Sequence, residues 1–176
     1  MKHFAYYPKI EYATESSVNI LVRGKIRDAI LQKAGLYYKY YIDDRDTAEM
    51  IAEKYYGSSE YVWAIYYANS IFHPTFEWPM RELVFIKFLE SKYGSVANAI
   101  NTTHHYEMTE TETNTTYIID ETTYRSQETA AGFPDYVRAV SSYNYELAEN
   151  NKRRNIVILD KAHLLAVTNE LKVLFK

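Results

Sequence analysis

Residues 40–69, YYIDDRDTAEMIAEKYYGSSEYVWAIYYAN, decide the fold of this chain because they place two helical patterns directly after an aromatic strand. The strand is predicted over residues 36–42, LYYKYYI, since aromatic residues favour a pleated, half-buried surface. The polar residues 43–45 that follow it predict a turn. This stretch therefore predicts a unit of one strand and two helices.

The first of the two helices is expected to begin at Asp46, which can cap the free N–H groups, while Glu49 three residues later reaches back to it. Gly57 ends this helix, because glycine enters the left-handed cap conformation without steric cost. Ser58 or Ser59 caps the second helix, which ends near residue 69. The apolar stripes are Ala48, Ile51, Ala52 and Tyr55 on the first helix, and Tyr61, Ala64, Ile65 and Ala68 on the second.

The same stretch resembles a LysM module. The resemblance rests on Ile42, Asp46, Thr47, Ile51, Ala52, Tyr56, Gly57, Trp63, Ile65 and Asn69. Arg45 stands where LysM modules usually have glycine, Ala48 replaces the usual leucine, and no clear closing strand follows Asn69. The resemblance implies that peptidoglycan would be bound by the loops at 43–47 and 69–72. Because Arg45 fills the turn where a close backbone approach is needed, we expect that this chain does not bind cell-wall glycan.

Toward the amino terminus, residues 1–17 predict an extended, tethered arm. A short helix is predicted over Arg23–Ala34, with Gly35 as its stop. On the other side of the LysM-like stretch, residues 74–79 predict a loop that contains Phe76 and Trp78.

The next helix is predicted from Pro79 to about Tyr93, with Gly94 as its stop. Residues 83–86, LVFI, are apolar on every side of this helix. Such a helix must be covered within its own fold or by another chain.

Residues 104–127 are rich in threonine and glutamate and predict a β-hairpin with a polar, exposed tip. Low complexity is the alternative, but the aromatic and β-branched content argues against full disorder. Residues 132–134, Gly-Phe-Pro, predict a second break.

The carboxy-terminal segment predicts a helix over 143–154 with Leu147 and Ala148 turned inward, and then a buried strand over 155–159, NIVIL. Asp160 caps a last helix. The seam of that helix is Leu164, Val167, Leu171 and Leu174 at 3,4 spacing. Because this seam is too short for an independent coiled coil, it needs a docking partner in this chain or in another.

These patterns predict an α+β fold: a LysM-like βαα module with an extended amino-terminal arm, a β-hairpin insertion and a carboxy-terminal helix–strand–helix segment. The predicted domains are an arm and short helix over 1–35, the LysM-like module over 36–73, a helix with the hairpin insertion over 74–133, and a docking segment over 134–176.

Size and composition favour an ordered, weakly acidic chain. It has 176 residues, a formal charge of −3 and no cysteine. The charge argues against a general nucleic-acid coat, and the lack of cysteine excludes disulfides and thiolate metal sites. We find no apolar run that could span a bilayer and no secretory signal, so assembly in a bacterial cytoplasm is expected.

Tyrosine is unusually common, with 19 residues, and several tyrosines are adjacent in sequence. Tyrosine combines a large apolar ring with a polar tip and is enriched at protein interfaces. Neighbouring side chains diverge on a helix or strand, so both members of a pair can rarely serve one core. We favour interfaces, and a tyrosine-rich ordinary core is the alternative.

No pattern of catalytic, cofactor-binding or metal-binding residues is recognised. The five histidines lack H-E-x-x-H spacing, and His104 and His105 are expected on opposite faces of a strand, a poor chelate. No phosphate-binding glycine loop occurs, and the paired carboxylates are interpreted as solvated surface acids. The basic triplet 152–154 can pair with Glu146 and Glu149, and an ion pair within the chain or with another protein is expected rather than nucleic-acid binding.

The two ends of the chain, HFAYYPKIEY at 3–12 and YNYELAENNKRRNIVIL at 143–159, resemble those of the small LysM-containing baseplate-wedge proteins of T-even-like contractile-tailed phages. The resemblance implies a non-enzymatic structural subunit that joins adjacent wedges around the tail hub. Its expected location is the virion tail baseplate, and its expected partners are other wedge and hub proteins, with no membrane. The alternative is a LysM-type peptidoglycan-binding module that serves a lytic enzyme.

The predicted partner-binding residues are aromatic, basic or part of the carboxy-terminal seam. They are Tyr6, Tyr7, Tyr37, Tyr40, Tyr66, Trp78, Phe85, Arg153, Arg154, Leu164, Leu171 and Leu174.

Overall fold

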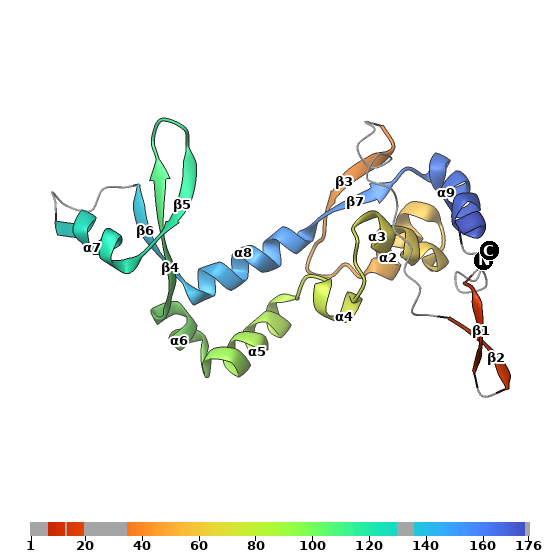
Figure 1. The fold of residues 1–176 in the computed structure, drawn as a ribbon, viewed down its shortest axis with the longest axis horizontal. Helices are drawn as coiled ribbons and strands as arrows, with labels where there is room; N and C mark the ends of the chain where they lie inside the picture. Colours follow the sequence, from red (N-terminus) through yellow and green to blue (C-terminus); the bar gives the residue numbers. More distant parts are fainter. Residues whose placement is uncertain (1–6, 13, 20–34, 130–135, 175–176) are drawn as a thin grey trace. The chain divides into compact units, whose positions relative to one another are not determined.

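The computed structural model describes residues 7–12, 14–19, 35–129 and 136–174, and its fold mixes helices and strands, which agrees with the predicted α+β class. The chain divides into two compact units (Figure 1). The first unit comprises Met1–Pro79 and Arg153–Lys176, and the second comprises Met80–Lys152. The helix predicted over 23–34 and the break predicted over 132–134 lie outside the described residues. No helix within the described residues is long and apolar enough to cross a membrane.

The sheet of the first unit pairs two strands that lie far apart in the sequence. β3, Tyr37–Tyr41, runs antiparallel to β7, Asn155–Leu159, with Lys39 opposite Val157. Both strands are where the aromatic and β-branched residues predict them. Their pairing brings the end of the chain onto the LysM-like stretch.

The two predicted helices between these strands are also present. α2, Ala48–Tyr56, ends at Gly57 in the left-handed conformation (φ 81°), as predicted. A short 3₁₀ turn, η2, Ser59–Tyr61, is capped by Ser58 and leads into α3, Val62–Ala68. The inward stripes are largely confirmed, since Ala48, Ile51, Ala52, Ala64, Ile65 and Ala68 are buried.

The predicted cap of α2 is wrong by one residue. Thr47 caps the helix, because its Oγ1 accepts a hydrogen bond from the backbone N–H of Met50 at 3.2 Å. Asp46 instead accepts from the Tyr40 hydroxyl at 2.8 Å and from the Asp43 backbone N–H at 3.0 Å. Asp46 therefore fixes the turn that follows β3 and does not cap the helix.

The core of the first unit is formed by α2, α3, β7 and the start of α9, Lys161–Leu174. Asp160 accepts a hydrogen bond from the Ala162 N–H at 2.7 Å, which agrees with its predicted capping role. The buried residues of this core are Ile42, Ile51, Ala52, Tyr56, Trp63, Ala64, Ile65, Tyr67, Ala68, Ile156, Ile158, Leu159, Leu164 and Val167.

Two segments of the first unit differ from the sequence interpretation. The predicted extended arm contains a hairpin of β1, Lys9–Tyr12, and β2, Glu15–Val18. The predicted loop at 74–79 contains a short helix, α4, Pro74–Glu77, whose first residue is proline. The carboxylate of Glu77 accepts from the backbone N–H groups of Phe72 and His73 and so satisfies the start of that helix.

The second unit begins with two helices, α5, Glu82–Tyr93, and α6, Val96–Asn101. α5 begins three residues later than predicted and is followed, as predicted, by Gly94, at φ 81°. The core residues here are Phe85, Leu89 and Ala99, with Met80, Phe88, Tyr93, Val96, Tyr143 and Leu147 packed around them. Phe85 is buried whereas Leu83 and Val84 are exposed, so the described chain covers only part of the apolar surface predicted for residues 83–86.

A three-stranded antiparallel sheet follows, in the order β5-β4-β6. β4, Thr103–Glu110, and β5, Thr115–Ile119, form the predicted hairpin, but residues after Asp120 form α7, Glu121–Thr129, rather than strand. β6, Val137–Ser141, pairs with β4 and was not predicted.

α8, Ser142–Arg154, is confirmed to within one residue of its predicted start. Leu147 packs against the core of the second unit, whereas Ala148 is exposed, so its predicted inward orientation is wrong.

Candidate functional site

The most developed polar site among the described residues lies on one face of the β5-β4-β6 sheet. Glu107 at the centre of β4 is opposite Ile118 on β5 and opposite Arg138 on β6. Side chains alternate along a strand, so His105 and Glu107 share this face. Tyr106 lies on the other face, where it packs on Tyr124 of α7 with ring centres 4.3 Å apart.

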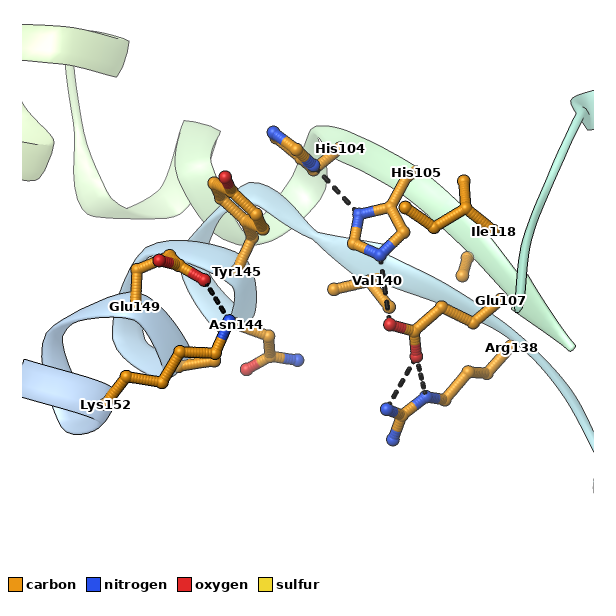
Figure 2. A pocket seen from close by; sticks show the side chains of 12 residues that line it. His104, His105, Glu107, Ile118, Arg138, Val140, Asn144, Tyr145, Glu149 and Lys152 are labelled. Carbon is orange, nitrogen blue, oxygen red and sulfur yellow. Dashed lines mark hydrogen bonds and ion pairs between the residues drawn. The ribbon is translucent and has the colours of Figure 1, made fainter. Parts of the chain in front are cut away.

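The backbone of β4 is irregular where this site begins. The pairing of β4 with β6 shifts register between Thr103 and His105, which marks a bulge at His104. The two adjacent histidines consequently meet, with Nδ1 of His104 2.8 Å from Nδ1 of His105 (Figure 2). The prediction that they point to opposite faces is wrong, because the bulge breaks the regular alternation.

The two imidazoles meet head-on rather than side by side. Their ring centres are 5.1 Å apart and their planes are nearly perpendicular. The separation of the ring centres equals the nitrogen–nitrogen distance plus the two ring radii, so each nitrogen points straight at the other. This is the geometry of an N–H···N hydrogen bond, not of two lone pairs that converge on a metal ion. No group of three or more metal-ligating side chains is found among the described residues.

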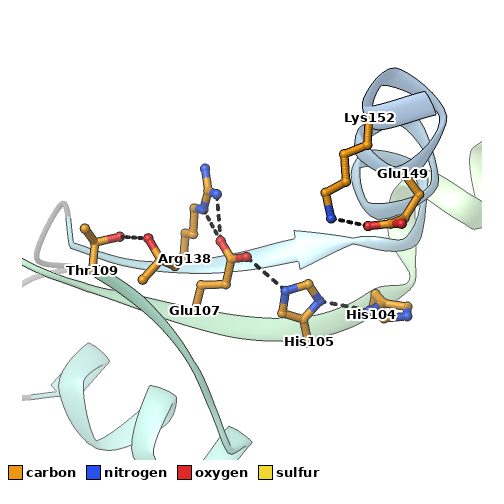
Figure 3. Close-up of polar contacts among 8 residues, drawn as sticks. His104, His105, Glu107, Thr109, Arg138, Glu149 and Lys152 are labelled. Carbon is orange, nitrogen blue, oxygen red and sulfur yellow. Dashed lines mark hydrogen bonds and ion pairs between the residues drawn. The ribbon is translucent and has the colours of Figure 1, made fainter. Parts of the chain in front are cut away.

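Glu107 anchors this pair from the other side. Its carboxylate lies 3.0 Å from Nε2 of His105 and accepts from Nε of Arg138 at 2.7 Å (Figure 3). Burial alone would raise the pKa of Glu107, but the hydrogen bonds and charges of His105 and Arg138 outweigh burial and lower that pKa. Because a carboxylate only accepts, His105 donates through Nε2. In the neutral tautomer that donates through Nε2, Nδ1 of His105 is an acceptor, and His104 is then the donor between the rings.

Helix α8 closes the other side of the site. The ring of Tyr145 stacks on that of His104, with ring centres 3.7 Å apart and planes within 9° of parallel. Glu149 lies one turn after Tyr145 on α8 and forms an ion pair with Lys152. Between α8 and the sheet is an open hollow of about 660 Å³, which we call the histidine hollow. It is lined by His104, His105, Glu107, Ile118, Arg138, Ala139, Val140, Asn144, Tyr145, Ala148, Glu149 and Lys152 (Figure 2).

The charges of the histidine hollow balance within it. Glu107 is matched by Arg138, and Glu149 by Lys152. The polar groups therefore mainly bind one another. Glu107 and Arg138 join β4 to β6, and the stacked rings of Tyr145 and His104 join α8 to β4. This arrangement supports a rigid platform better than selection of a strongly charged ligand.

Several predicted partner-binding residues lie inside the chain's own cores. Tyr7 is buried and its hydroxyl is hydrogen-bonded to that of Tyr67. Phe85 is buried in the second unit, and Leu164 in the first. Their contact with a partner stays a prediction, and in the described chain their side chains serve the cores.

The remaining predicted aromatic residues are half-buried. Tyr37 and Tyr40 lie on β3. The ring of Tyr66 meets that of Trp78 edge to face, with centres 6.2 Å apart. Tyr6 and the side chains of Leu171 and Leu174 lie outside the described part of the chain.

The two predicted arginines make contacts within the first unit. Arg153 donates to the Phe76 carbonyl oxygen at 2.8 Å. Arg154 pairs with Asp44 at 2.8 Å and donates to the Ile42 carbonyl oxygen at 3.0 Å. The expectation of ion pairs for the basic triplet is confirmed for Lys152 and Arg154, although Glu146 pairs with Lys92 instead.

β7 lies in the segment predicted to dock, and its outer edge is occupied at its centre by a side chain. The Asn69 carboxamide donates to the Val157 carbonyl oxygen and accepts from the Val157 N–H, both at 2.8 Å. Val157 therefore already has both backbone partners, and this edge is not open at that point. Arg45, in the turn before α2, is exposed, and Ile71 is half-buried.

The sequence contained part of the signal for the histidine hollow. The alternation of His105 and Glu107 places both on one strand face, but the bulge and the strand that carries Arg138 have no local pattern. Comparison with known proteins adds nothing to this assignment, because no family model and no curated protein matches the chain.

Proposed function

We propose that the chain is a non-enzymatic structural subunit of a contractile phage tail baseplate wedge, which helps to join adjacent wedges around the tail hub. The observation that carries the proposal is the number of large apolar side chains that the described chain leaves uncovered. Leu83 is 74% exposed, Phe76 76% and Ile118 75%, and they lie on different helices and strands. Exposed apolar surface of this kind is typical of contacts with other proteins.

The architecture of the first unit supports the LysM part of this proposal. The order β3, α2, α3, β7 gives two strands with two helices between them. We propose a LysM-like module whose closing strand, missing after Asn69, is supplied by β7 after the second unit has been inserted. The resemblance of both chain ends to wedge proteins supports the placement of such a module in a baseplate.

The glycan-binding alternative has less support. In the turn at 43–47, Asp44 is engaged by Arg154 and Asp46 by Tyr40. Arg45 is exposed where a glycan would need to approach the backbone. We therefore propose that the module is used as a scaffold and not for binding cell wall.

Co-expression of the chain with neighbouring tail proteins, followed by purification of the wedge, tests this function. We expect the wild-type chain to copurify with them. Leu83→Asn should reduce copurification and leave the thermal stability of the isolated chain unchanged, because this side chain is exposed. Lys87→Asn, at another exposed position one turn along α5, is the matched control and should copurify normally.

Two results would contradict the proposal. In the first, the wild-type chain sediments with peptidoglycan but does not copurify with tail proteins, which would favour the cell-wall alternative. In the second, Leu83→Asn and Lys87→Asn copurify equally well, which would remove the exposed face of α5 from the assembly contact.

A further inference from the structure

The edge of the second unit's sheet at β5 is open. β5 pairs with β4 on one side, and it is the outer strand of the order β5-β4-β6. Four of its five residues are exposed, and no described segment pairs with its outer side. In an antiparallel ladder alternate residues direct their N–H and C=O groups outward, so this edge offers backbone donors and acceptors to another strand.

β5 also lacks the features that usually protect an edge strand. Its sequence, TTYII, contains no charged residue, proline or glycine. The other edge strand of this sheet, β6, carries Arg138, and the amino-terminal hairpin carries Lys9, Glu11 and Glu15. β3 carries Lys39 at its centre, and β7 is blocked at Val157 by Asn69. β5 is therefore the least protected strand edge among the described residues.

Both faces of β5 present an apolar side chain to a neighbour. Tyr117 is 49% exposed and lies on the α7 face, and Ile118 is 75% exposed and lies beside the histidine hollow. An added strand with β-branched or aromatic residues would form cross-strand pairs on both faces at once.

Acidic residues surround the two ends of this strand. Glu110 and Glu112 lie at the hairpin tip, and Asp120 follows the strand. Hydrogen bonds from Thr123 hold the pKa of Asp120 below its usual range, so it stays charged. Glu121 is already paired with Arg125, whereas no ion pair is found for the other three carboxylates within the described residues.

These charges determine which kind of strand can pair with β5. A second copy added antiparallel would bring the acidic tip of one β5 beside Asp120 of the other, and a parallel copy would bring the two tips together. Both arrangements place like charges side by side, which is unfavourable. We propose that β5 is a strand-addition site for an extended segment of a different protein, with a β-branched centre and basic residues at both ends. This inference goes beyond the proposed function and does not depend on it.

Binding of three synthetic peptides to the full chain tests the proposal. The first has a threonine- and valine-rich centre with two lysines at each end, the second has glutamates in place of the lysines, and the third is the lysine peptide with alternate backbone nitrogens methylated. We expect the lysine peptide to bind and to slow hydrogen exchange at residues 115–119. The glutamate peptide should bind about tenfold more weakly, and the methylated peptide should not bind.

A matched pair of variants tests whether the peptide binds at β5. Ile118→Thr keeps a β-branched residue but removes exposed apolar surface, so it should weaken binding of the lysine peptide several-fold. Ile10→Thr makes the same change on β1, another exposed strand, and should have no effect. The proposal would be overturned if the methylated peptide bound as tightly as the lysine peptide, or if the lysine peptide did not bind at millimolar concentration. Concentration-dependent self-association that Ile118→Thr abolishes would show that a second copy is the occupant and would overturn it as well.

Discussion

Asn69 joins two parts of the chain through a single carboxamide. It donates to the carbonyl oxygens of Ile65 and Val157, both at 2.8 Å, and accepts from the N–H of Val157. These contacts close α3 and hold it on β7. The residue therefore connects the helix end to a strand that lies 88 residues further along the chain.

Asn69→Ala should destabilise the first unit by about 2–3 kcal/mol, because it leaves the partly buried backbone groups of Val157 without a partner. Asn69→Asp keeps the acceptor but loses the donor and should destabilise as well. Urea unfolding followed by the fluorescence of Trp63 and Trp78 measures both. Asn101→Ala, at an exposed helix end, is the control. Equal midpoints for Asn69→Ala and wild type would show that the carboxamide adds no stability.

Single residues differ in how well their role could be predicted. The role of Gly57 follows from its position at the end of a helical pattern, and the structure has it at φ 81° with its N–H bonded to Glu53. Asn69 could be predicted to end α3 but not to bind Val157, since that contact depends on tertiary pairing. Residues 55 and 56 depart from the prediction that both members of a tyrosine pair can rarely serve one core, because Tyr55 packs against the core in which Tyr56 is buried.

Elements with strong local patterns were predicted well, and their partners were not. α2 and α3 follow from apolar periodicity and from glycine or serine boundaries, and β7 follows from a short run of apolar residues. The pairing of β3 with β7 and of β4 with β6 could not be predicted, because strand pairing is set by the whole sheet and leaves no local signal. The histidine hollow needs both the second pairing and a bulge, so only the shared face of His105 and Glu107 was predictable.

Glu107 is expected to stabilise the sheet of the second unit in a pH-dependent way. Its pKa is lowered in the folded chain by His105 and Arg138 despite its burial. A carboxyl with a lowered folded pKa stabilises fully above its unfolded pKa, near 4.3, and this stabilisation is lost as the pH falls through the folded value. Glu107→Gln should therefore cost on the order of 1 kcal/mol at pH 7, and the difference from wild type should shrink below about pH 4.

Thermal unfolding of both proteins at several pH values measures this difference. Glu112→Gln, in the exposed turn between β4 and β5, is the control and should match wild type at every pH. A constant deficit of Glu107→Gln down to pH 3 would mean that packing, rather than the charge, explains its effect.

At the scale of the whole molecule, tyrosine is distributed over both units and joins elements in each. In the first unit Tyr56 donates to the Leu159 carbonyl oxygen at 3.0 Å, and Tyr38 donates to Asp160 at 2.9 Å. In the second unit Tyr93 donates to Glu146 at 2.9 Å. The high tyrosine content thus serves internal contacts in addition to the exposed surface proposed for assembly.

The tyrosines of the first unit predict alkaline unfolding of that unit. Burial raises the pKa of Tyr40, Tyr55 and Tyr66 to about 12, helped by Asp46 at Tyr40, by Tyr38 at Tyr55 and by Glu49 at Tyr66. These tyrosines therefore ionise more easily in the unfolded chain, near pH 10, than in the folded chain. Their contribution to the free energy of unfolding is fully present below pH 10 and is lost as the pH rises toward 12. Unfolding midpoints in urea should therefore fall steeply between pH 10 and 12, together with a rise in tyrosinate absorbance.

Tyr40→Phe cannot ionise at this position, so its unfolding midpoint should fall less steeply over the same pH range. Identical slopes for this variant and wild type would exclude Tyr40 from the alkaline transition.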